Sequence, residues 1–275
     1  MAKLCAAEVA LAPLTVGRPE APEMVAAAEA GGFRRLGMAL WTPDGRLDAT
    51  CTDGRALRDT ARALARTGTE VTDVSVVVLS GRLDLGRVRR VLEAGRALGA
   101  RRVVVMNRDP NAGRAAVALG SVADLAGELD MRVGLEFMPY SATPDIAAAV
   151  ALLRAVASPR VGLVLDLLHL FRSGGGPREV SRLPVPLVLV QLCDAVGSPP
   201  PRARLRAESL TDRRYPGHGD LPLHAVLAPI PAGVPITLEA PVARDAGLPP
   251  AERARRAAEA VRWFAAGNIS STDGR

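Results

Sequence analysis

Four polar side chains stand at or beside the ends of four consecutive apolar segments in the second half of the chain. They are Glu136, Asp166, Gln191 and Glu239, in the segments VGLEF, VGLVLD, LVLVQL and PITLE. A strand buried on both faces is apolar and has no structural use for a carboxylate or an amide at its end. If the strands run parallel in a barrel, their C-terminal ends open on one face, where these four groups would converge. Converging carboxylates repel one another unless a cation lies between them, so we predict that the four residues hold one divalent metal ion.

His169 is a further candidate, because it lies three residues after Asp166 in the segment VLDLLHLFRSG. This spacing places it just past the strand, at the rim of the predicted site. An unperturbed imidazole titrates near neutral pH, so His169 is a candidate general acid or base, or a hydrogen-bonding partner of a substrate. The alternative is a histidine that only stabilises its loop. The oxygen ligands of the predicted site favour Mg²⁺, Mn²⁺ or Co²⁺ over metals that prefer thiolates.

Other residues are candidates for contacts with a substrate. Arg214 lies in a long loop after the seventh apolar segment and could bind an anionic group, although Arg213 is indistinguishable from it by sequence. Trp41 ends the second predicted strand and Tyr140 closely follows Glu136. Because aromatic residues are only 3% of the chain, we predict that both form walls of the pocket. Asn107, at the end of another apolar segment, is a weaker candidate. The alternatives are a solvated arginine in an arginine-rich chain, and core or rim packing for the aromatic rings.

The elements that must position these residues alternate along the whole sequence. The apolar runs, rich in Val and Leu, predict strands at about 4–11, 34–40, 71–79, 102–106, 132–137, 160–166, 186–192 and 234–240. The segments between them predict helices near 20–31, 53–67, 86–98, 112–129, 144–156, 177–182, 220–228 and 249–265. This alternation predicts an α/β protein with the (β/α)8 TIM-barrel fold.

The 275 residues are enough for one such barrel, which typically needs about 250. We assign the barrel to residues 1–266 as a single domain and expect residues 267–275 to be a flexible tail. The longest irregular stretch is predicted at 196–219. A loop of this length is uncommon and is often functional.

Composition excludes several classes of function. The net charge of +6 and pI near 10.1 come from arginines spread among acids, which argues against a nucleic-acid partner. Lys3 is the only lysine and lies near the N-terminus, so a Schiff-base enzyme is not expected. The three cysteines form neither a disulfide framework nor a CxxC site, which favours a cytoplasmic location. No apolar run approaches the roughly 20 residues of a membrane span.

The ordered set of motifs resembles the xylose-isomerase-like barrel superfamily of sugar phosphate isomerases and epimerases. The motifs here are Glu136, Asp166 with His169, Gln191 with Asp194, Pro216-Gly217-His218-Gly219-Asp220, and Glu239. In ketose 3-epimerases of that superfamily, Glu, Asp, His and Glu hold one divalent metal, and the two glutamates move protons on opposite faces of the substrate. The resemblance therefore implies that Glu136 and Glu239 act as base and acid.

Three positions depart from the epimerase pattern. Gln191 stands where sugar epimerases have a metal-binding histidine, Met138 replaces a second histidine found in some relatives, and His218 replaces an acid in the Pro-Gly-x-Gly loop. Glutamine at position 191 is also found in the related 3-dehydroshikimate dehydratases. Those enzymes use the histidine of Asp-x-x-His as a base, and this role would fall to His169.

We expect a divalent-metal-dependent isomerase or epimerase acting on a sugar or a related polyhydroxy carbonyl compound. A cation bound to a carbonyl and an adjacent hydroxyl acidifies the C–H between them and stabilises the enediolate, so a carboxylate can move the proton. A dehydratase of the 3-dehydroshikimate or inosose type is the alternative, and a non-catalytic binding protein with a degenerate site is a second one. A DNA-repair endonuclease on the same barrel is not expected, because its multi-zinc site needs many histidines and this chain has three. The partner is a small molecule, and a homodimer is expected only by analogy.

Overall fold

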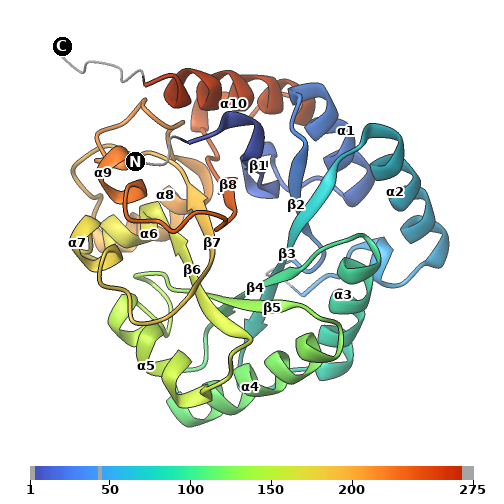
Figure 1. Cartoon of the computed structure of the whole chain (residues 1–275), viewed down its shortest axis with the longest axis vertical. Coiled ribbons are helices and arrows are strands. Elements are labelled where there is room, and N and C mark those ends of the chain that lie inside the picture. The colour runs from blue at the N-terminus through green and yellow to red at the C-terminus, as the bar shows by residue number, and fades with distance from the viewer. Residues whose placement is uncertain (1–3, 43–44, 268–275) are drawn as a thin grey trace.

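The eight strands of this computed structural model, which describes residues 4–42 and 45–267, form a closed parallel barrel (Figure 1). Each strand pairs with its neighbours in sequence, and β1 closes the barrel against β8. The strands are β1 Ala10–Leu11, β2 Arg35–Ala39, β3 Glu70–Leu79, β4 Arg102–Asn107, β5 Arg132–Glu136, β6 Val161–Asp166, β7 Leu187–Leu192 and β8 Ile236–Leu238. The predicted TIM-barrel fold is confirmed, and seven of the eight strands begin and end within two residues of the prediction.

Helices surround the barrel and connect its strands (Figure 1). The α-helices are α1 Ala21–Gly31, α2 Gly54–Thr67, α3 Leu85–Ala97, α4 Ala112–Glu128, α5 Ile146–Val156, α6 Leu167–Arg172, α7 Pro177–Val180, α8 Leu205–Thr211, α9 Leu223–Leu227 and α10 Pro250–Ala265. None of the helices in the described ranges is long and apolar enough to cross a membrane. Residues 268–275 lie outside the described residues, so the flexible tail remains a prediction.

Two sequence predictions were wrong. Residues 4–9 are not a strand, because Ala6–Glu8 forms a 3-10 turn in which the amide of Glu8 donates to the carbonyl of Cys5 at 3.0 Å. The stretch 196–219 is not irregular throughout, because it contains α8. The three prolines at 199–201 precede a run of good helix formers, LRAESL, and that run forms the helix.

The apolar core has two parts. The larger part lies between the strands and the surrounding helices, and a smaller one fills the barrel interior with Val104, Val164 and Leu189. Gly162 on β6 makes room for this filling. A Cβ atom built there would lie 2.5 Å from the carbonyl oxygen of Pro186 and 2.7 Å from a methyl group of Val188.

Gly162→Ala is therefore expected to lower the free energy of unfolding by about 1–3 kcal/mol, as overpacking of a filled core does. Urea denaturation followed by circular dichroism measures the change. Gly120→Ala on α4 is the control, because a Cβ atom at that position would lie 4.0 Å from its nearest neighbouring atom. It should stabilise the protein by up to about 1 kcal/mol, since alanine is the better helix former. Equal effects of the two changes would contradict this description of the barrel interior.

Candidate active site

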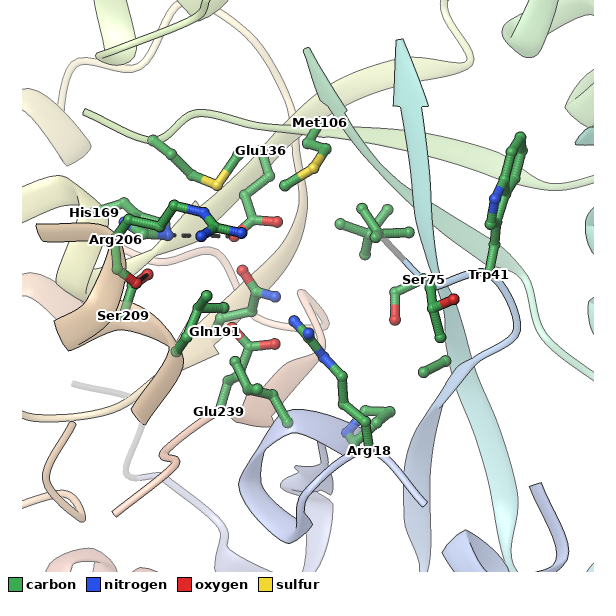
Figure 2. A pocket seen from close by; sticks show the side chains of 18 of the residues that line it. Arg18, Trp41, Ser75, Met106, Glu136, His169, Gln191, Arg206, Ser209 and Glu239 are labelled. Carbon is green, nitrogen blue, oxygen red and sulfur yellow. Dashed lines mark hydrogen bonds and ion pairs between the residues drawn. The ribbon is translucent and has the colours of Figure 1, made fainter. Parts of the chain in front are cut away.

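A pocket of about 480 Å³ opens at the C-terminal ends of the strands, where barrels carry their active sites (Figure 2). Glu136, Gln191 and Glu239 all line it, and so does His169 from α6. Asp166 lies beneath them, fully buried. The structure thus brings together the four residues that were predicted as metal ligands, together with His169.

Two of the carboxylates, those of Glu136 and Asp166, and the imidazole of His169 approach to within metal-binding reach of one another. One ligand atom from each of Glu136, Asp166 and His169 can be chosen so that all three lie within 4.8 Å. The Nε2 atom of His169 is 3.7 Å from Oε1 of Glu136. Asp166 also begins α6, because its Oδ1 accepts a hydrogen bond of 2.9 Å from the amide of His169. This cap turns His169 inward from the helix, so it is buried rather than at the rim as predicted.

Gln191 contributes an unpartnered acceptor. Its Oε1 is buried and has no hydrogen-bond partner among the described residues, at a position between Glu136 and Glu239 in Figure 2. A buried acceptor without a donor costs about 1–3 kcal/mol. A cation that takes this oxygen as a ligand would remove that cost.

Arg213 is the cation that the structure places among these acids. It is 1% exposed. Its Nη1 lies 2.5 Å from Oδ2 of Asp166, and its Nη2 lies 3.2 Å from Oε2 of Glu239. Its Nε donates to the carbonyl of Ser209 at 2.8 Å. Arg213 therefore links two of the predicted metal ligands and neutralises part of their charge.

Burial raises the pKa of each of these acids, and neighbouring charges decide the net shift. Burial raises the pKa of Glu136 well above its usual range, and the charges of Glu239 and Asp166 raise it further. Burial also raises the pKa of Glu239, although Arg213 opposes the rise. For Asp166, the effect of burial is outweighed by Arg213 and His169, so its pKa is lowered. Burial lowers the pKa of His169 to about 4, so its imidazole is neutral at physiological pH.

These donors suit a hard divalent cation. Glu136, Asp166, Gln191 and Glu239 offer oxygen atoms and His169 offers a nitrogen, which is the ligand chemistry of Mg²⁺, Mn²⁺, Co²⁺ and zinc sites. Burial is the largest cause of the raised pKa of Glu136 and Glu239, and a bound cation would stabilise their charged forms and give the unpartnered Oε1 of Gln191 a partner.

The predicted substrate contacts fall in different places. Of the two adjacent arginines, Arg213 lines the pocket, whereas Arg214 turns outward and pairs with Asp212 at 3.6 Å. Trp41 and Tyr140 both line the pocket. Asn107 does not line it, because its side chain is buried in hydrogen bonds to the Asp109 carbonyl and the Thr143 hydroxyl.

The helix α8 supplies Arg206, Ser209 and Leu210 to the pocket wall, and the sequence prediction missed it. Glu208 on α8 pairs with Arg172 at the end of α6, with 2.6 Å between Oε1 and Nη2. Ser209 bonds the Tyr140 hydroxyl at 2.7 Å. The Glu208 and Ser209 contacts hold α8 over the strand ends. The run of helix-forming residues after the prolines at 199–201 could have predicted this helix from the sequence.

Asp194 organises the loop that contains His218. Its carboxylate accepts hydrogen bonds of 3.0 Å from the amides of Gly217 and Gly219 and one of 3.1 Å from the amide of Leu221. His218 packs edge-on against Trp263 at 5.1 Å and does not line the pocket. The Pro-Gly-His-Gly-Asp motif is therefore a structural loop here, fixed by the aspartate that follows β7.

A sequence model of the xylose isomerase-like TIM barrel family matches residues 25–266. The chain belongs to this family. Its motifs and its closed parallel barrel agree with that membership. No curated protein matches the chain significantly by sequence alone.

Solved structures of the same fold align over nearly the whole chain. The IolI protein, solved with a bound zinc atom, has a TM-score of 0.76 at 17% identity, over 96% of this chain and 100% of that one. The probable 3-DHS dehydratase AsbF from Bacillus anthracis has a TM-score of 0.73 at 12% identity, over 93% and 98%. D-allulose 3-epimerase from Methylomonas sp., in complex with D-allulose, has a TM-score of 0.66 at 17% identity, over 95% and 98%. The chain spans only 45% of a longer family member, a fusion with 4-hydroxyphenylpyruvate dioxygenase.

Arg213→Met is expected to lower the free energy of unfolding of the metal-free protein by about 3–5 kcal/mol, because it leaves two buried carboxylates without their cation. Denaturation in the presence of a chelator measures the change. Arg214→Met is the matched control, since its partly exposed side chain pairs only with exposed Asp212, and its effect should stay within about 0.5 kcal/mol. A small effect of Arg213→Met would show that its buried ion pairs are not required.

Another buried acid, Asp73 on β3, lies against Gly37 of β2, and its Oδ1 has no partner among the described residues. Burial raises its pKa to about 7, the charge of Glu239 adds to the rise, and Arg102 opposes it. A folded-state pKa above the unfolded value of about 3.9 gives stability that is complete below pH 4 and is lost as the pH rises through 7.

Asp73→Asn removes this titration. The free energy of unfolding of the variant minus that of the wild type should therefore grow by about 2–3 kcal/mol between pH 5 and pH 7. Denaturant titrations at a series of pH values measure this difference. Asp124→Asn, at an exposed position on α4, is the control. If the difference for Asp73→Asn does not change with pH, Asp73 does not titrate in this range.

Proposed function

We propose that this protein is a divalent-metal-dependent isomerase or epimerase acting on a polyhydroxy carbonyl compound. The observation that carries the proposal is the pair Glu136 and Glu239, one buried and one largely buried carboxyl group on either side of Gln191 in one pocket (Figure 2). Both have a pKa above the usual range. A group that takes up and returns a proton works best when its pKa lies near the working pH.

The residues have distinct parts in the proposed reaction. Glu136, Asp166, Gln191 and Glu239 would hold the metal, which when bound polarises the substrate carbonyl and stabilises the enediolate. Glu136 removes the proton from the carbon next to the carbonyl. Glu239 returns a proton to the opposite face of the same carbon in an epimerisation, or to the neighbouring carbon in an isomerisation. Trp41 and Tyr140 exclude water from the substrate.

The similar structures support this class of reaction. One is a D-allulose 3-epimerase in complex with D-allulose, and another is solved with a bound zinc atom. At 17% identity both show the fold alone, so the reaction is proposed on the pocket of this chain.

A dehydratase is the second candidate, and the position of His169 favours it. The buried imidazole lies 3.7 Å from Glu136, and burial lowers its pKa to about 4, so it is in the neutral form at pH 7. Removal of a proton followed by loss of a β-hydroxyl as water would use the same site. A structure named as a probable 3-DHS dehydratase has the same fold. Loss of water from the product distinguishes a dehydratase from an isomerase.

The purified protein is expected to contain about one Mg²⁺, Mn²⁺, Co²⁺ or zinc ion per chain. Mass spectrometry of the metal content measures it, before and after reloading. Glu239→Gln should lower the metal affinity, because it removes one of the negative charges at the site. Asp212→Asn, which affects an exposed carboxylate, is the control. No metal in the reloaded wild type would contradict the proposal and favour a non-catalytic binding protein.

Glu136→Gln should lower turnover by about 10²–10⁴-fold with the fold intact, as loss of a general base does. Incubation of the wild type in D₂O with ketoses, inososes and 3-dehydroshikimate finds the reactive compound, because an enediolate takes up deuterium at carbon. Epimerisation and isomerisation keep the unlabelled mass, whereas dehydration lowers it by one water. A metal-loaded protein that exchanges no C–H bond in any of these compounds would count against proton transfer.

A further inference from the structure

We propose that the substrate carries an oxyanion group, a carboxylate or a phosphate ester, and that Arg18 and Arg206 bind this group beside the metal centre. The inference rests on the proposed function and names the class of substrate that the pocket takes. It is carried by two cations that line the pocket and form no ion pair with any described residue.

Arg18 enters the pocket from the loop between β1 and α1. Its backbone is in the left-handed region, with φ at 55°, and its amide donates to the carbonyl of Pro13 at 2.8 Å. This conformation is uncommon for a residue with a side chain. The guanidinium is directed toward Gln191 and Glu239 in Figure 2, yet it forms no ion pair or side-chain hydrogen bond with any described residue. A constrained backbone thus holds an unpaired charge at the metal centre.

Arg206 enters from α8. Its guanidinium also points into the pocket in Figure 2 and has no ion pair within the described part of the chain. Its carbonyl accepts a hydrogen bond of 2.9 Å from Ser209, the residue that bonds Tyr140. The backbone of Arg206 is therefore fixed relative to the pocket wall, while its charged end remains available to a ligand.

Arg18 and Arg206 are not needed to balance the negative charges of the proposed metal site. Glu136, Asp166 and Glu239 contribute three negative charges at most. A divalent ion and Arg213 together supply three positive charges, which balance them. Arg18 lowers the pKa of Glu136 and Glu239 through its charge but pairs with neither, so Arg18 and the exposed Arg206 and Arg108 have no ion-paired counterpart among the described residues that line the pocket. A substrate with one or two negative charges would supply it, through charge-assisted and bidentate hydrogen bonds.

The rest of the lining argues against a neutral, fully hydroxylated sugar. Much of the wall is apolar, formed by Leu14, Val76, Val104, Met106, Met138 and Leu210. The hydroxyl groups of the lining already bond within the protein, namely Thr42 to Arg46, Ser75 to Met38, Tyr140 to Ser209 and Ser209 to Arg206. Few neutral donors remain for a hydroxyl on every carbon. The wall fits a compact hydroxy-carbonyl compound whose affinity comes from its charged group.

The test is calorimetric binding to Mn²⁺-loaded and metal-free protein, with two matched pairs of probes. D-allulose 6-phosphate is compared with D-allulose, and 3-dehydroshikimate with its methyl ester. In the loaded wild type, at least one charged probe should bind about tenfold or more tightly than its neutral partner. Arg18→Gln and Arg206→Gln should each weaken that probe by about 10- to 100-fold and change the neutral partner less than about twofold. The pair that shows the preference tells a phosphate from a carboxylate.

Arg202→Gln is the control, because this exposed arginine precedes α8 and does not line the pocket. It should leave all four affinities unchanged. The proposal is overturned if neither charged probe is preferred, or if the preference survives in both Arg18→Gln and Arg206→Gln. Charge preference without any bound metal would refute the proposed reaction but keep the anion site. Bound metal without a preference for the charged probe would refute the anion site but leave the proposed reaction standing.

Discussion

The site follows from one constraint, namely three carboxylates at one end of a barrel, of which Glu136 and Asp166 are buried and Glu239 is largely buried. Charges in a poorly solvated interior interact strongly, and each one loses hydration. Arg213 offsets this cost for Asp166 and Glu239, and the pKa of Asp166 falls below its usual range. Among the described residues, Glu136 has only His169 within ion-pairing distance, and the pKa of this glutamate is raised well above its usual range. Burial and the mutual repulsion of these carboxylates therefore favour a cation between them and raise the pKa of Glu136 and Glu239.

The surrounding elements fix this imbalance in space. Asp166 is both the last residue of β6 and the N-cap of α6, so the strand end and the position of His169 are set by the same side chain. On the other side, α8 is tied to α6 through Arg172 and Glu208 and supplies the carbonyl that orients Arg213. The acids are thus carried by rigid strand ends, and the cation among them is held by a helix outside the barrel.

The barrel and its central residues could be predicted from the sequence, because each depends on local information. Strands buried on both faces appear as apolar runs, and acids at their ends are conspicuous for that reason. Which of the two adjacent arginines turns inward could not be predicted, since this depends on the backbone between α8 and β8. Asn107 ends a strand, and Gln191 lies near the end of another, so the sequence does not distinguish them. The side chain of Asn107, however, donates a hydrogen bond to the backbone carbonyl of Asp109 and does not reach the pocket. Arg18 gave no signal at all, because only its position in the closed barrel brings it to the acids.

The ion pairs of Arg213 bear on whether the barrel folds before or after it binds a metal ion. Because the chain supplies its own cation for Asp166 and Glu239, the barrel can fold before any metal arrives. A zinc finger, by contrast, is unfolded until it binds its ion. A metal ion bound as proposed would share two carboxylates with a guanidinium that is already bonded to them, which would lower its affinity. Metal loading would then follow folding, and the scaffold would persist whether or not the ion is present.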